Sequence, residues 1–121
     1  MDSRQKRDEL ARRFVRYAAR ILGLSAALPK TEEGMHVRGQ ITRSGTAPGA
    51  HYREACGAES RADFAHKMQI VLKELRETEY WLKLATRAKL VPANLLSEPL
   101  AEADELIRIV VKSVVTAKSR L

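Results

Sequence analysis

Residues 100–121, LAEADELIRIVVKSVVTAKSRL, carry the clearest structural signal in this 121-residue chain. Apolar side chains recur there at alternating steps of three and four residues, which predicts an α-helix with one continuous apolar seam over three heptads. Acidic residues gather early in the stretch and basic residues late, as the dipole of a helix favours. The seam consists of Leu100, Ala103, Ile107, Val110, Val114, Ala117 and Leu121.

More apolar side chains flank this seam than the core of one subunit needs. Surplus apolar surface on a helix is typical of a contact with another protein chain. We therefore expect the chain to form a homo-oligomer. The residues expected at the subunit interface are Leu106, Ile109, Val111, Val115 and, from an earlier helix, Trp81.

Three earlier segments show the same helical period, most clearly the stripe Leu10, Phe14, Tyr17, Ile21, Leu24 and Leu28. The expected helices span about residues 4–26, 34–56, 61–89 and 93/98–120, the start of the last one being open between 93 and 98. Pro48 lies inside the second helix, where we expect a bend. Helices of this length with short connections predict an all-α, antiparallel up-down-up-down four-helix bundle in a single domain, 1–121.

Composition agrees with a globular helical protein. The chain is 45% hydrophobic and 31% charged with only 6 Gly and 4 Pro, and no apolar run is long enough to span a membrane. The single cysteine, Cys56, cannot form an internal disulfide, and residues 1–10 lack the apolar stretch of a signal peptide. We expect a cytoplasmic protein without a membrane partner.

The net charge of +7 is concentrated near the start of the chain, where residues 1–30 hold eight basic and three acidic side chains. Several of these basic residues recur at helical spacing, which favours binding to a polyanion such as RNA or DNA. The alternative is an ordinary solvated helix face, partly balanced by Asp8 and Glu9, on an adaptor that binds a protein partner. The candidate nucleic-acid-binding residues are Arg4, Lys6, Arg7, Arg12, Arg13, Arg16 and Arg20.

A second polar group lies on the two middle helices. It holds both arginines and glutamates, and an arginine between packed helices is tolerated only with a carboxylate partner, which predicts an interhelical ion-pair network. We expect this network to be structural and to fix the helix register. Its candidate members are Arg43, Arg53, Glu54, Glu74 and Glu77.

No constellation of catalytic or metal-binding residues is evident. Glu33 with His36, and Asp63 with His66, have the Glu-x-x-His type of spacing, but two further inward carboxylates are missing. Cys56 and His51 lack an oxyanion site and a third orienting group. We therefore expect no enzyme activity, no metal, no cofactor and no small-molecule substrate.

Four short segments resemble a known family: RSGT at 43–46, GAHYREA at 49–55, ESRADFAHK at 59–67 and YWL at 80–82. The chain is similar here to the bacterial four-helix-bundle proteins encoded in intervening sequences of large-subunit ribosomal RNA genes. The resemblance implies a ring-shaped homo-oligomer, typically a pentamer, without established enzyme activity. It also extends to the accessory protein of diversity-generating retroelements, whose basic ring is thought to bind nucleic acid. His51 and Pro48 depart from the family's usual Asn and β-branched residue.

Overall fold

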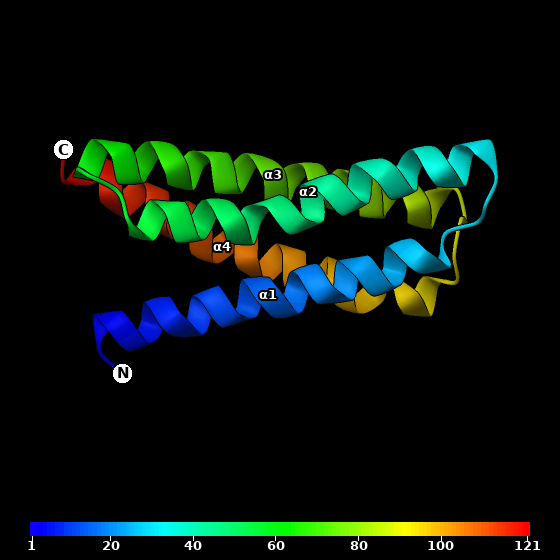
Figure 1. Ribbon diagram of the computed structural model, residues 1–121, viewed down its shortest axis with the longest axis horizontal. Coiled ribbons are helices and arrows are strands. Elements are labelled where there is room, and N and C mark those ends of the chain that lie inside the picture. The colour runs from blue at the N-terminus through cyan, green and yellow to red at the C-terminus, as the bar shows by residue number, and fades with distance from the viewer.

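The computed structural model describes residues 1–121 as four long helices and one 3₁₀ turn, without strands. The helices are α1 (Ser3–Ala27), α2 (Glu32–Cys56), α3 (Arg61–Arg87) and α4 (Ser97–Ser119), and the 3₁₀ turn η1 (Ala93–Leu95) precedes α4. Successive helices run in opposite directions along one long axis (Figure 1). The predicted all-α, four-helix architecture is confirmed, and α4 begins inside the predicted interval. No helix is both long and apolar enough to cross a lipid bilayer.

Side-chain caps mark where the first three long helices begin. Asp2 caps α1 in a capping box with Gln5, the Thr31 hydroxyl accepts a bond from the Gly34 amide at α2, and the Ser60 hydroxyl accepts one from the Asp63 amide at α3. These bonds satisfy amides that have no partner within the helix.

The core is one cluster of apolar side chains contributed by all four long helices. The predicted stripe on α1 faces this core, since Phe14, Tyr17 and Ile21 are each at most 1% exposed. On α4 the buried side differs from the predicted seam: Leu106 is fully buried, whereas Ile107 is only half-buried. This overturns the placement of Leu106 at a subunit interface, because its side chain is already enclosed by its own subunit.

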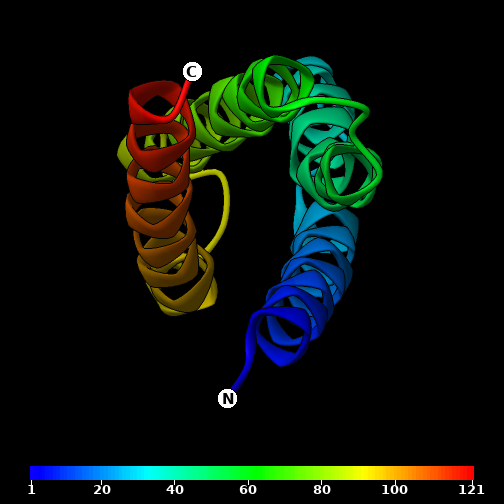
Figure 2. The same cartoon turned by 90° about the vertical axis from the view of Figure 1, so that its left-hand side faces the viewer.

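The four helices lie along an open arc with α1 and α4 at its two ends, as the end-on view shows (Figure 2). Each helix packs mainly against its neighbour in the chain, and α1 and α4 have few direct contacts. Gly45 allows α1 and α2 to approach closely, because a Cβ at this position would lie 2.5 Å from Cγ2 of Ile21. Pro48 is buried within α2, which continues as a helix through it to Cys56.

Candidate nucleic-acid interface

Three exposed arginines of the predicted basic stripe on α1 are bound to carboxylates. Arg12 and Arg16 both pair with Glu9, at 3.0 and 3.4 Å, and Arg20 lies 3.7 Å from Glu98 of α4. The hydrogen bonds from Arg12 and Arg16 lower the pKa of the Glu9 carboxyl below its usual value. Much of the positive charge along the middle of α1 is therefore offset locally.

Arg13 is the most enclosed arginine of this stripe. Its guanidinium group pairs with Glu102 and also lies 3.0 Å from Glu105, both on α4. The bond to Glu102 raises the pKa of Arg13 above its already high value. This side chain joins two helices and has little capacity left for a phosphate.

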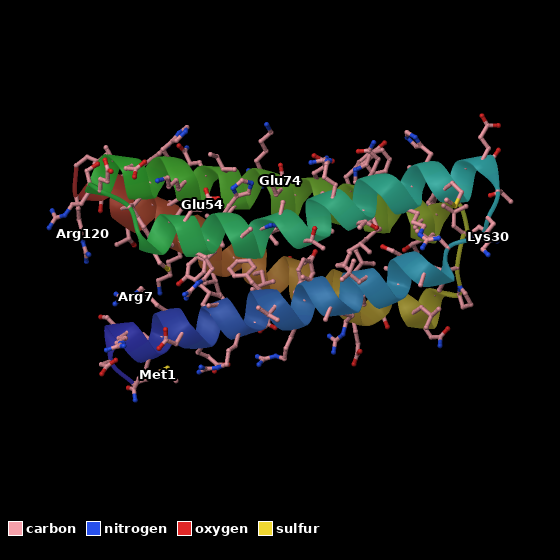
Figure 3. All side chains as sticks on the ribbon, in the orientation of Figure 1. Met1, Arg7, Lys30, Glu54, Glu74 and Arg120 are labelled. Carbon is pink, nitrogen blue, oxygen red and sulfur yellow. The ribbon has the colours of Figure 1, made fainter.

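Arg4, Lys6 and Arg7 differ from the rest of the stripe because they are exposed and form no ion pair. They lie in the first two turns of α1. Figure 3 places Arg7 at the same end of the molecule as Arg120 and far from Lys30. The uncompensated positive charge of α1 is thus found at one end of the bundle.

A hollow of about 590 Å³ opens at this end, and we call it the end pocket. The start of α1, the end of α2, the start of α3 and the end of α4 all contribute to its lining. Glu59 is its only acidic residue, and no basic residue of the lining forms an ion pair with a carboxylate. The basic residues are Arg7, Arg61, Lys112 and Arg120.

Apolar side chains also line the end pocket. Phe64 and Ile109 are half-buried there, with the smaller Ala55 and Ala117 beside them. The Arg61 side chain is exposed, and its Nη1 donates a 3.2 Å bond to the carbonyl oxygen of Arg120. The lining of the site therefore combines basic and apolar side chains.

The sequence analysis missed Arg61, Lys112 and Arg120. These residues are about 50 to 110 positions away from Arg7 along the chain, so helical periodicity could not group them. The useful signal was topological: in an antiparallel bundle, the starts of the first and third helices lie beside the ends of the second and fourth. Basic residues at those four helix ends necessarily share one end of the molecule.

The predicted polar network is smaller than expected. Arg43 of α2 pairs with Glu74 of α3 at 3.2 Å and also with Glu77. Glu77 in addition accepts a 3.1 Å bond from the indole N–H of Trp81. Together these contacts connect the middle of α2 to α3.

Arg53 and Glu54 do not join this network, which corrects the prediction. Arg53 is exposed without an ion pair, and Glu54 lies 3.9 Å from Nδ1 of His51 on the same helix. Both side chains are on α2 about three turns beyond Arg43, too far along the helix axis to reach Glu74 or Glu77.

The other residues predicted at a subunit interface occupy different environments. Val115 is 62% exposed, and Val111, one turn earlier on α4, is half-buried. Ile109 instead lines the end pocket. Trp81 is half-buried between the His36 ring, 5.7 Å away, and the Tyr80 ring, 5.0 Å away.

The residues considered for metal or nucleophilic chemistry do not converge. No three His, Cys, Asp or Glu side chains gather in a way that could hold a metal ion. The Asp63 carboxylate accepts bonds from Lys67 and from the Glu59 amide, which lower its pKa. Cys56 is exposed at the edge of the end pocket.

Comparison with known proteins identifies one family to which this chain is similar. Residues 7–112 match the model of the 23S rRNA-intervening sequence protein family. A solved structure from Bacteroides thetaiotaomicron, described as a protein with unknown function from the S23 ribosomal protein family, is 35% identical with a TM-score of 0.80. The alignment covers 86% of this chain and 96% of that one. No curated protein matches. With the match spanning most of its length, the chain belongs to the 23S rRNA-intervening sequence protein family.

Proposed function

We propose that the protein is a non-enzymatic, oligomeric scaffold that binds RNA or DNA without sequence specificity through the basic end of the bundle. The observation that carries this proposal is the set of cations in the first turns of α1 and in the lining of the end pocket that have no carboxylate partner. This surface, the basic end, consists of Arg4, Lys6, Arg7, Arg61, Lys112 and Arg120.

The lack of ion pairs matters because a paired arginine must give up its carboxylate before it neutralises a phosphate. An exposed, unpaired basic side chain can neutralise a phosphate directly. The counterions released in this way drive binding to nucleic acid at low salt. Arg12 and Arg16, which share Glu9, are expected to contribute less than Arg7.

Assembly of identical subunits would repeat this surface and raise its effective affinity for a long polyanion. Apolar side chains left exposed by the monomer support assembly, namely Val115 on α4 and Tyr80 and Leu84 on α3. The proposed assembly is a homopentamer. Light scattering should then give a particle five times the mass of the 13.6 kDa chain, whereas a stable monomer at high concentration would overturn this part of the proposal.

The test of the function is the binding of a labelled 30-nucleotide RNA, followed by fluorescence anisotropy over a salt titration. Affinity should fall as salt rises, with a slope of about −0.7 per phosphate contact for a single strand. Arg7→Glu should weaken binding at least tenfold. Lys30→Glu is the matched control, since Lys30 is exposed and unpaired at the opposite end of the bundle (Figure 3).

Two outcomes would contradict this function. One is the absence of binding at about 50 mM salt, where electrostatic contacts are strong. The other is equal weakening by Arg7→Glu and Lys30→Glu, which would show that only net charge matters. The adaptor function would instead be favoured if this chain has no affinity for RNA or DNA and a partner protein stays bound to it through purification after nuclease treatment.

A further inference from the structure

The end pocket has the dimensions of a site for one small molecule rather than for a double helix. Its volume of about 590 Å³ lies within the range of roughly 300–1,000 Å³ that is typical of ligand sites. The hollow lies between the ends of four helices. A basic surface alone would bind phosphates anywhere along a strand, so the hollow needs its own explanation.

The lining separates two kinds of chemistry. Phe64 of α3 and Ile109 of α4 offer an aromatic and an aliphatic surface inside the hollow. Arg61 lies one turn before Phe64, and Lys112 lies one turn after Ile109, so each apolar residue has a cation beside it on the same helix. A ligand that fits both needs a flat apolar part attached to an anionic part.

A nucleoside monophosphate has this combination. Its base can stack on an aromatic side chain, and its phosphomonoester carries a charge of about −1.5 to −2 at pH 7. An internal phosphodiester of a strand carries only one negative charge. Four cations against the single carboxylate of Glu59 therefore favour a terminal phosphate over an internal one.

We propose that the end pocket binds a single nucleoside monophosphate group, with the base against Phe64 and Ile109 and the phosphomonoester against Arg61, Lys112 and Arg120. Arg7 contributes a fourth cation to the lining, from α1. This inference rests on the proposed function, because the natural source of the group is the 5′ end of a bound strand. A free mononucleotide has the same chemistry and is the second possible source.

The test compares two single-stranded RNAs of one sequence, labelled at the 3′ end, one with a 5′-phosphate and one with a 5′-hydroxyl. The 5′-phosphorylated strand should bind the intact protein at least tenfold more tightly. Free AMP should displace it at concentrations where inorganic phosphate does not, because phosphate lacks the base.

Lys112→Glu should abolish the preference for the 5′-phosphate. Lys118→Glu is the matched control: Lys118 is exposed on the same helix, carries the same charge and does not line the end pocket. This variant should keep the preference. Circular dichroism would show whether both variants fold as the original chain does.

The outcomes separate this inference from the proposed function. Equal affinity for both strands, with no displacement by AMP, would overturn the pocket assignment and leave general RNA binding in place. Displacement by inorganic phosphate as effective as that by AMP would show that the base is not bound, and would also overturn it. Binding of AMP without binding of either strand would support a mononucleotide site and overturn the proposed function. No binding of any of these ligands would overturn both.

Discussion

The guanidinium group of Arg13 in α1 pairs with both carboxylate oxygens of Glu102 in α4, with Nε–Oε1 and Nη2–Oε2 distances of 3.1 Å each. Since α1 and α4 have few other direct contacts, the ends of the arc are connected by this pair, by the one with Glu105 and by the pair of Arg20 with Glu98. Two parallel bonds to a partly buried carboxylate form a stronger contact than a typical surface ion pair.

Replacing Arg13 should therefore destabilise the monomer. Arg13→Met keeps an aliphatic side chain but removes the charge, and it should lower the free energy of unfolding in urea by about 1–2 kcal/mol. Arg13→Lys should recover only part of this loss, because an ammonium group cannot form the two-pronged contact. Arg12→Met is the control, with an expected change below about 0.5 kcal/mol. Equal effects of the Arg12 and Arg13 variants would contradict the prediction.

Arg43→Ala should be the more damaging of two arginine replacements on α2. Glu74 is only 9% exposed, so loss of its partner leaves a poorly solvated carboxylate, at an expected cost of about 2 kcal/mol. Arg53→Ala should change stability by less than about 0.5 kcal/mol because Arg53 is exposed and unpaired. Thermal melts of the two variants measure the difference, and a larger effect of Arg53→Ala would refute the observed network.

Tyr17→Phe should stabilise the protein. The Tyr17 side chain is buried and its hydroxyl has no hydrogen-bond partner. The Thr78 hydroxyl donates its own hydrogen bond to the Glu74 carbonyl. Removing an unsatisfied buried hydroxyl without changing the ring should raise the free energy of unfolding by about 1 kcal/mol. Urea denaturation at pH 7 measures this, and a loss of stability would mean that the hydroxyl is bonded.

The same residue should affect stability at alkaline pH. Burial raises the pKa of Tyr17, and burial together with the neighbouring Cys56 raises the pKa of Tyr52. A raised pKa in the folded state means that stability is constant below the unfolded value of about 10 and falls above it. Each tyrosine contributes a slope of up to about 1.4 kcal/mol per pH unit. Tyr17→Phe should remove one of these two contributions, and an unchanged slope between pH 10 and 11 would argue against the burial effect.

Two glycine replacements on α2 should change the free energy of unfolding in opposite directions. Gly45→Ala places a methyl group against the fully buried Ile21 and should cost about 2 kcal/mol through overpacking. Gly39 is exposed with nothing near its Cβ position, so Gly39→Ala should gain about 1 kcal/mol from helix propensity. Chemical denaturation of both variants tests the pair, and destabilisation by Gly39→Ala would show that this face of α2 is covered.

Helix periodicity predicted the architecture because each helix buries one stripe. The stripe from Phe14 to Leu24 on α1 is buried as predicted. On α4 apolar residues surround much of the helix, so periodicity could not distinguish Leu106, which is buried, from Ile107, which is half-buried. Only the packing of α3 against α4 decides which side faces inward.

Contacts between distant residues explain what the sequence analysis missed at the site. Arg13 and Glu102 are 89 positions apart, and nothing in the local pattern around Arg13 distinguishes it from Arg12. The assignment of the whole α1 stripe to nucleic acid therefore included arginines that hold helices together. The end pocket was missed for the same reason, since its rim is assembled from four helix ends.

In the open arc each helix packs on its neighbour in the chain, and this arrangement affects the rate of folding. Tertiary contacts that join consecutive helices keep the contact order low, and all-helical domains of this kind fold within microseconds to milliseconds. During synthesis, each helical hairpin can form as soon as its second helix has left the ribosome. The pairing of Arg13 with Glu102 joins the first and last helices, so we expect it to form late in folding. The Arg13→Met variant should then unfold faster while its folding rate stays nearly unchanged.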